Sequence, residues 1–311
     1  MSQKLTQETL DSTRDMLKKM SKYRNATGDE YPSRAYDNAA KSLTSIRALD
    51  SVIAGVNMPK GIGKKIREVI IEFVSTGRVN ELIELRDNPQ VAALEKFEKV
   101  MGIGPVNALK FVDMGYTSLE ELRKYPHLTK QQKIGIDLHD KIMLRVPRAT
   151  VTQVFDVLRG MILTVDKSSD SIVSGSYRRG ASTSGDVDIL VRSDTISAKT
   201  IVANVEKTMK DAIIVVSAGD QKAMFLYKLP GGAYIQVDIF VCKSDEYIAH
   251  LNYSTGSASH NIKVRKAAIK KGYKLSQHGL FKGTKKIKLS TERELYDLVG
   301  IPYSDPTSRN D

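Results

Sequence analysis

The stretch from Gly175 to Arg192 constrains the fold of this chain more than any other segment, and it reads GSYRRGASTSGDVDILVR. It ends in an alternating run in which Asp186 and Asp188 are separated by a single apolar residue. Successive side chains of a strand point to opposite faces, so the apolar residues face away from both aspartates. The run therefore predicts a strand that carries two carboxylates on one face, roughly 6.5 to 7 Å apart.

A second predicted strand supplies a third acid. In AYIQVDIFV, residues 233–241, Asp238 lies on the face opposite the apolar positions Ile235, Val237, Ile239 and Val241. Two carboxylates close together in a partly buried site stay ionised only if a cation lies between them, and oxygen ligands favour Mg²⁺ or Mn²⁺. If the two strands are neighbours, three carboxylates converge, which is enough for two metal ions about 3.5 to 4 Å apart and suits in-line phosphoryl transfer.

The residues before the aspartates decide between two interpretations of the pair. An Asp-x-Asp pair on a strand is by itself more often a solvated face than a metal site. Here, however, Gly175 suits a tight turn, and Gly185 permits close approach of a phosphate. The Ser176 hydroxyl, Arg178 and Arg179 are suited to clamp an anion. The stretch therefore predicts metal ions together with a bound triphosphate.

The first third of the chain predicts helices joined by glycine turns. In IREVIIEFVSTG, apolar residues recur at helical spacing over 66–74, and Gly77 is placed to end the helix. Gly-Ile-Gly occurs twice just before a helical pattern, in PKGIGKKI (59–66) and in VMGIGPVNALKF (100–111). This is the helix-hairpin-helix arrangement, in which glycines let the backbone approach a DNA phosphate and free N–H groups point at it. Simple helix capping is the alternative.

The charge of the chain favours a nucleic-acid partner. Lys and Arg number 48 and Asp and Glu 36, which gives a net charge of +12, so we expect a polyanionic partner, with nucleic acid ahead of a membrane surface. A merely soluble basic protein is the alternative. Cys242 is the only cysteine, which excludes an intramolecular disulfide and a cysteine-based zinc site and suits a reducing compartment. No apolar run reaches the roughly 18 residues that span a bilayer, and the N-terminal segment lacks a signal-peptide core. We therefore expect an intracellular protein that is not secreted.

After Pro147 the pattern changes from helices to short strands. Strands are predicted in SIVSGS, DVDILVR, AIIVVSAG, KAMFLYKL and AYIQVDIFV, and a helix is predicted in VFDVLRGMILTV. Because 311 residues are too many for one ordinary core, we expect two to four compact units. The sequence thus predicts an α+β chain with a helical first part and a sheet domain after it.

Taken in order, these motifs resemble those of the family X DNA polymerases, which belong to the nucleotidyltransferase superfamily. GSYRRGASTSGDVDIL, both glycine hairpins, LRVPR, VDIF, YSTGS and NIKVRKAAIKKGY appear in the family's order over nearly the whole chain. The resemblance implies an N-terminal all-helical domain with two helix-hairpin-helix motifs, a nucleotidyltransferase mixed β-sheet palm and a small C-terminal nucleotide-selecting subdomain. The implied parts are a helical 5′-end and DNA-binding domain at 1–84, a DNA-gripping subdomain at 85–146, a catalytic palm at 147–244 and the nucleotide-selecting subdomain at 245–311.

The resemblance also implies a role for each site residue. Asp186 and Asp188 bridge two Mg²⁺ ions, for which Mn²⁺ can substitute, and Asp238 binds the catalytic ion beside the primer 3′-hydroxyl. The phosphates of an incoming dNTP are contacted by Arg145, Ser176, Arg179 and Gly185. Its sugar and base are contacted by Tyr253, Gly256, Asn261 and Arg265, with a cis peptide bond between Gly256 and Ser257. The DNA is held by Gly61, Gly63, Lys65, Gly102 and Gly104, with a monovalent cation at the two hairpins.

The spacing of Asn261 and Arg265 agrees with this assignment, because residues four apart share one face of a helix. Lys263, Lys266 and Lys270 lie mostly elsewhere on the same predicted helix. We expect those lysines to form a solvated surface.

One position of the first domain departs from the family. Val69 stands where members with 5′-deoxyribose phosphate lyase activity carry the lysine that forms a Schiff base. Valine has no amine, and the helical periodicity places it on the apolar face. Lys65 matches a lysine that binds the 5′-phosphate; the alternative is that Lys60, Lys64 or Lys65 replaces the nucleophile. We expect 5′-phosphate binding with weak or absent lyase activity.

The nucleotide pocket departs from the family as well. Ser254 replaces a phenylalanine, Ala258 replaces an acidic residue, and Phe240 replaces an arginine that changes partners as the enzyme opens and closes. Gln277 and His278 replace the later partners of that arginine, so we expect a different closing switch, and fidelity is not inherited from the family. The short hairpin YKLPGGAYIQ lacks the long loop of template-independent members and favours templated synthesis.

These observations together predict a DNA-directed DNA polymerase that fills short gaps. We expect a monomer that acts on gapped or primed duplex DNA with dNTPs, in the nucleus or another site of DNA repair and not at a membrane. An untemplated nucleotidyltransferase acting on RNA or a small molecule and a non-catalytic DNA-end-binding protein are the alternatives. The paired hairpins, YSTGS and Arg265 argue against the first, and three intact aspartates argue against the second.

Overall fold

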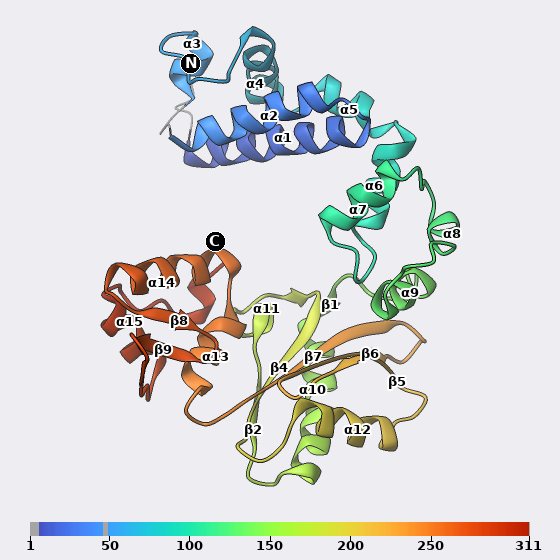
Figure 1. The fold of residues 1–311 in the computed structure, drawn as a ribbon, viewed down its shortest axis with the longest axis vertical. Helices are drawn as coiled ribbons and strands as arrows, with labels where there is room; N and C mark the ends of the chain where they lie inside the picture. Colours follow the sequence, from blue (N-terminus) through green and yellow to red (C-terminus); the bar gives the residue numbers. More distant parts are fainter. Residues whose placement is uncertain (1–5, 46–48, 311) are drawn as a thin grey trace. The chain divides into compact units, whose positions relative to one another are not determined.

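The computed structural model describes residues 6–45 and 49–310 and divides into two compact units, Met1–Asp137 and Leu138–Asp311 (Figure 1). The first five residues of the charged N-terminal segment and the last residue of the predicted C-terminal subdomain lie outside the described residues. The finer division into four parts stays a prediction. No described helix combines the length and the apolar character needed to cross a membrane.

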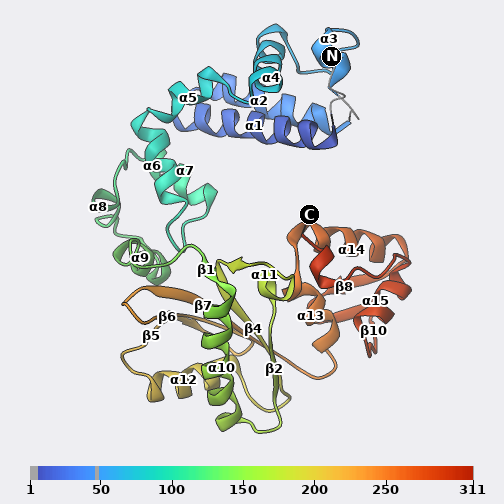
Figure 2. The ribbon, with the colours of Figure 1, turned by 180° about the vertical axis from the view of Figure 1, so that it is seen from behind.

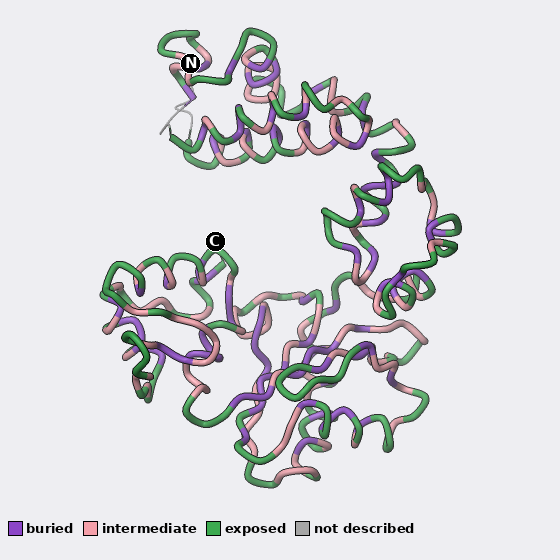
Figure 3. Tube along the Cα trace, viewed as in Figure 1, coloured by how far each residue is buried: buried purple, intermediate pink, exposed green. Residues whose placement is uncertain are grey.

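The first unit is helical, as the sequence predicts. Its helices are α1 (Gln7–Ala26), α2 (Glu30–Ser42), α3 (Asp50–Ala54), α4 (Lys64–Thr76), α5 (Asn80–Arg86), α6 (Pro89–Phe97), α7 (Pro105–Asp113), α8 (Leu119–Leu122) and α9 (Lys130–Asp137), with a 3₁₀ turn at Leu43–Ser45. The predicted helix ends at Gly77, whose φ of +70° stops it. The apolar residues of α4, among them Val69 and Ile70, pack in one hydrophobic core with residues of α1, α2, α6 and α7. Figure 3 shows that buried and exposed residues alternate along these helices.

The two Gly-Ile-Gly segments have the same local structure. The first glycine of each has a positive φ, +94° at Gly61 and +84° at Gly102. The second glycine of each is the N-cap of the helix that follows, Gly63 for α4 and Gly104 for α7. A Cβ atom on Gly102 would lie 2.8 Å from Gln131 Cγ, so this turn requires glycine for two reasons.

The second unit begins with a five-stranded mixed sheet in the order β2-β4-β7-β6-β5. The strands are β2 (Asp170–Val173), β4 (Asp186–Arg192), β5 (Ile213–Ala218), β6 (Lys222–Lys228) and β7 (Tyr234–Cys242), which confirms all five predicted strands. Only β4 and β7 pair in parallel among the described strands of this sheet. Helices α10 (Arg148–Val165) and α12 (Ala198–Thr208) cover one face of the sheet and bury its apolar side chains (Figures 1 and 2).

The second unit has two further parts, a group of short elements next to β4 and a C-terminal part that follows the sheet in the chain. A short pair, β1 (Val146–Pro147) and β3 (Thr183–Ser184), and the single helical turn α11 (Gly175–Arg178) lie close to β4. Helix α13 (Tyr247–Thr255) leads to α14 (Ala258–Lys270), the small sheet of β8 (Lys274–Ser276), β9 (Gly279–Lys282) and β10 (Lys285–Ile287), then α15 (Glu292–Val299) and a 3₁₀ turn at Pro306–Ser308. This last part has its own hydrophobic core around Val264, Leu295 and Tyr296.

Candidate active site

The two acidic strands are neighbours in the sheet. In the parallel pairing of β4 with β7, Asp188 lies opposite Asp238, and Asp186 lies opposite Gln236. The alternate residues, such as Val187 and Ile189, are fully buried against α10 and α12. The three aspartates therefore lie on the face of the sheet that these helices leave uncovered.

A pocket of about 550 Å³ lies over this face. Its lining combines residues of α11, β4, β7, α13 and α14, and the predicted site residues among them are Ser176, Arg179, Asp186, Asp188, Tyr253, Gly256, Asn261 and Arg265. Three further predicted residues, Arg145, Gly185 and Asp238, are not part of the lining. Arg145 instead donates to Thr183 Oγ1 at 2.8 Å and to the Thr183 carbonyl at 2.6 Å.

Gly175 has a sharper role than the tight turn that the sequence predicts. Its φ is +55°, and a Cβ atom built on it would lie 2.1 Å from Asp188 Oδ2. No other residue fits there unless the carboxylate moves. The glycine thus allows α11 to lie directly against the acidic strand.

The electrostatics of the acids favour a cation. Burial, followed by the charges of Asp186 and Asp238, raises the pKa of Asp188 to about 8. Burial and the charge of Asp238 also raise the pKa of Asp186. A divalent cation bound by these oxygen donors would offset the repulsion that a proton otherwise relieves. The donor set therefore fits the predicted metal chemistry.

The side chains do not form a closed metal site as they stand. Within residues 6–45 and 49–310, no three His, Cys, Asp or Glu side chains lie close enough together to hold an ion. Lys222 Nζ lies 2.8 Å from Asp238 Oδ2 and neutralises that carboxylate. Sequence reasoning missed Lys222, because its position depends on how β6 pairs with β7. A local sequence pattern does not contain that register.

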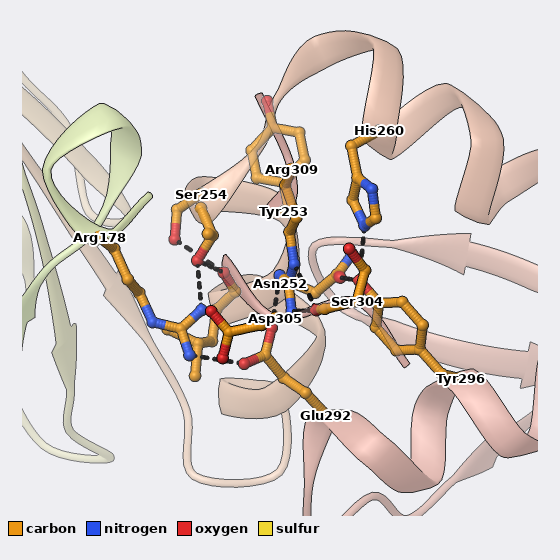
Figure 4. A network of polar contacts seen from close by, with 12 residues as sticks. Arg178, Asn252, Tyr253, Ser254, His260, Glu292, Tyr296, Ser304, Asp305 and Arg309 are labelled. Carbon is orange, nitrogen blue, oxygen red and sulfur yellow. Dashed lines mark hydrogen bonds and ion pairs between the residues drawn. The ribbon is translucent and has the colours of Figure 1, made fainter. Parts of the chain in front are cut away.

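Arg178 corrects a sequence prediction. It does not point its charge at an anion in the pocket but donates to Glu292 Oε2 at 2.6 Å and to Thr255 Oγ1 at 2.7 Å. Glu292 also accepts from Arg309 Nη1 at 2.8 Å, and Arg309 is fully buried. Figure 4 shows this network, which ties α11 to α13, α15 and the C-terminal segment. The positive charge of Arg178 is thus paired with the buried Glu292. Arg178 therefore holds α11 against the elements that form the pocket and does not contact a ligand.

Arg179 stays at the pocket and contacts its other wall. Its Nη1 donates to the Thr255 carbonyl at 2.7 Å, and its Nε donates to Asn310 Oδ1 at 3.0 Å. The peptide bond between Gly256 and Ser257 is cis, as the family resemblance implies. A Cβ on Gly256 would lie 3.1 Å from Arg179 Nη1, so the glycine leaves room for the guanidinium.

A row of ring contacts runs from α14 through α13 to β7. The Arg265 guanidinium lies 5.6 Å from the centre of the Tyr253 ring, which makes an edge contact with the His250 ring 6.0 Å away. The His250 ring in turn lies 5.8 Å from that of Phe240. Asn261 Nδ2 donates to the Tyr253 carbonyl at 2.8 Å, while its buried Oδ1 has no hydrogen-bond partner among the described residues.

The DNA-binding residues predicted for the first unit are divided between two places. Gly61, Gly63 and Lys65 line a hollow of about 600 Å³ together with Tyr31 and Tyr36. Gly102 and Gly104 form the turn before α7. Val69 is 6% exposed and packs in the core, as its periodicity predicts.

Three protein families match successive segments of the chain. The fingers domain of DNA polymerase lambda matches residues 95–143, the DNA polymerase beta palm matches 145–227, and the DNA polymerase beta thumb matches 250–310. The segments follow one another in the chain order that the motifs predict.

Curated proteins of the same kind are similar over most of the chain. DNA polymerase lambda of Arabidopsis thaliana is 30% identical over 315 residues, which is 92% of this chain and 59% of the relative. DNA polymerase lambda of Rattus norvegicus is 28% identical over 99% of this chain and 57% of its own length. DNA nucleotidylexotransferase of Xenopus laevis is 24% identical over 87% and 63%. The chain thus spans about three fifths of the length of these relatives.

Proposed function

The chain belongs to the family X DNA polymerases, and from that premise we propose that it is a DNA-directed DNA polymerase that fills short gaps. The observation that carries the proposal is the parallel register that sets Asp188 beside Asp238, with Asp186 two residues away on the same face. This acidic face opens into one pocket with Arg179 and Arg265. A pocket that combines carboxylates with guanidinium groups suits a nucleotide and a primer end.

The three aspartates would hold two Mg²⁺ ions, with Mn²⁺ as a substitute. Asp186 and Asp188 would bind both ions, and Asp238 would bind one of them. When bound, such ions lower the pKa of the primer 3′-hydroxyl and neutralise the charge that develops on the phosphates. Asp238 is 5% exposed, and it would receive the proton of the primer 3′-hydroxyl once its contact with Lys222 is released.

The other pocket residues would bind and orient the nucleotide. The Ser176 hydroxyl and the Arg179 guanidinium would contact its phosphates. Arg145 and Gly185, which do not line the pocket, would contact the phosphates as well, as the family resemblance implies. Tyr253 and Gly256 would contact the sugar. Asn261 and Arg265 would contact base edges, and the unpartnered buried oxygen of Asn261 supports a role in binding a ligand.

The first unit would hold the DNA. The two glycine hairpins and Lys65 would bind its backbone phosphates, with a monovalent cation at the hairpins and a 5′-phosphate in the hollow beside Gly61. With Val69 in the core, we propose that lyase activity is weak or absent. We also propose action as a monomer at a site of DNA repair such as the nucleus.

Primer extension on a duplex with a one-nucleotide gap tests the proposal. With Mg²⁺ or Mn²⁺, we expect the templated dNTP to be added and pyrophosphate released, and Asp186→Asn to abolish addition without loss of DNA binding. Equal addition of all four dNTPs to a single strand would favour an untemplated transferase instead. Binding without any addition would leave a DNA-end-binding protein.

A further inference from the structure

A second groove lies on the outer side of α14. It has a volume of about 570 Å³ and lies between this helix and the end of α15; its lining is Ser259, Ile262, Lys263, Lys266, Ala267, Lys270, Lys271, Val299, Gly300 and Ile301. We call it the thumb groove. Gly300, the C-cap of α15, has a φ of +73°, and a Cβ there would lie 2.5 Å from Lys271 Cε. The glycine thus leaves space for the stem of that lysine.

The thumb groove carries a concentrated positive charge. Four of its lining residues are lysines and none is acidic. Across the described parts of the chain, none of these four lysines takes part in an ion pair. Like charges one helical turn apart, such as Lys266 and Lys270, repel each other on a helix. A groove of this kind is suited to an anionic polymer, whose charges would relieve that repulsion.

The thumb groove continues directly from the nucleotide pocket. Ile262 lines both of them and is 54% exposed. At roughly 100° per residue around α14, the exposed residues Ile262 and Ile269 follow the base-facing pair Asn261 and Arg265, and the lysines follow the isoleucines. A strand whose base lies against Arg265 would therefore meet an apolar strip and then the lysines as it leaves the pocket.

We propose that the thumb groove binds the template strand on the 5′ side of the templating nucleotide, as single-stranded DNA. Its phosphates would lie on Lys263, Lys266 and Lys270, and its unstacked bases against Ile262, which lines the groove, and against the exposed Ile269 outside that lining. A positively charged groove that follows the phosphate backbone binds single strands without reading their sequence; here aliphatic side chains, in place of aromatic rings, would contact the bases. This proposal rests on the proposed polymerase function, because that function defines which strand leaves the pocket.

Binding to primer–templates of different overhang length tests the proposal. We would compare the full chain with a Lys266→Gln and Lys270→Gln double variant, using fluorescence anisotropy and template overhangs of one or nine nucleotides. The variant should lose about tenfold in affinity for the long overhang and little for the short one, and its salt slope should fall by about 1.4, or 0.7 for each lost phosphate contact. A Lys285→Gln and Lys288→Gln variant has the same change in charge on exposed lysines in and beside β10 and should retain the full overhang effect.

The other outcomes overturn the proposal in different ways. Equal loss of affinity for both overhangs would assign the thumb groove to duplex DNA, and unchanged affinity would show that it binds no DNA. Dependence on overhang length in a protein that extends no primer would defeat the polymerase function and keep a single-strand groove. The two failures are distinguishable because binding is measured without nucleotide.

Discussion

The pocket over β4 and the hollow beside Gly61 are similar in size and lining but differ in the reactive side chains beside them. Both have volumes near 550 to 600 Å³ and combine glycines, basic residues and tyrosines. The first is lined by Asp186 and Asp188, and Asp238 lies opposite Asp188 on the neighbouring strand. The second has Val69 in the core, at the position where the family resemblance implies an amine for lyase activity. The comparison teaches that two hollows of similar size and lining can differ in the reactive side chains placed beside them.

The hollow beside Gly61 also shows what holds its scaffold in place. Glu81 accepts from Tyr36 at 3.0 Å and from Arg24 at 2.6 Å, and Lys65 Nζ lies 3.7 Å from it. Glu81 thus joins α1, α2, α4 and α5 without any contribution from position 69. The contacts that hold this hollow together therefore do not depend on the side chain at position 69.

The largest effect should come from Asp188→Asn. The change keeps the shape of the side chain but removes a charge that the proposed ions require, and metal ligation contributes several kcal/mol to such reactions, which is roughly 10³-fold in rate. Single-turnover extension on a gapped duplex measures it. Asp156→Asn on the exposed side of α10 is the matched control and should leave the rate unchanged; equal rates for both variants would contradict the site.

Gly175→Ala should come next. Its methyl group would lie 2.1 Å from Asp188 Oδ2, so the carboxylate has to move by about an ångström, a displacement that costs about 10²-fold in rate. The same assay measures it. Gly160→Ala in the middle of α10, where a Cβ meets nothing within 4 Å, should leave the rate unchanged and raise stability slightly. A Gly175→Ala variant with full activity would show that the contact with Asp188 does not matter.

Buried polar groups sharpen the comparison between the regions. In the first unit Tyr36 is buried and bonded to Glu81, whereas His250 is 6% exposed and neither ring nitrogen has a partner among the described residues. Burial lowers the pKa of His250 to about 4. Because the unfolded chain binds a proton near pH 6.5 and the folded one does not, stability should fall as the pH falls from 6.5 towards 4.

His250→Leu should remove this pH dependence. Between pH 7.5 and pH 5.0 the free energy of unfolding of the unchanged protein should fall by about 2 kcal/mol relative to the variant. Urea unfolding of both proteins, followed by circular dichroism at the two pH values, measures the difference. A change of the same size in both would show that other groups are responsible.

Local sequence patterns predicted most of the helices and strands. The contacts that they missed depend on how distant segments pair in the folded protein. The helix ending at Gly77 and the faces of β4 and β7 follow from spacing alone, because helical and strand periodicities are local. The ion pair of Lys222 with Asp238 depends on the pairing of β6 with β7. The bond from Arg178 to Glu292 joins residues 114 positions apart. The sequence therefore pointed to the three aspartates, but not to the pairing of Lys222 with Asp238 or to the partner of Arg178.

A single substitution should introduce lyase chemistry at the hollow beside Gly61. In a Val69→Lys variant, the apolar stem of the lysine would lie in the hydrophobic core of the first unit and its amine would extend to solvent. Burying this longer side chain would lower the stability of the protein. An amine at this position could form the Schiff base with the sugar aldehyde that the family resemblance implies for lyase activity. We expect borohydride trapping on a 5′-deoxyribose phosphate end to rise about tenfold above the unchanged protein, since a well-placed nucleophile gives an effect of at least this size.

Val69→Met is the matched control, because it lengthens the side chain without supplying an amine. It should show the same background as the unchanged protein, while gap filling stays active in both variants because position 69 lies in the other compact unit from the aspartates. Strong trapping in the unchanged protein would mean that Lys60, Lys64 or Lys65 already acts as nucleophile. The hollow beside Gly61 would then have a nucleophile at a different position of the chain, and Val69 would not prevent lyase activity.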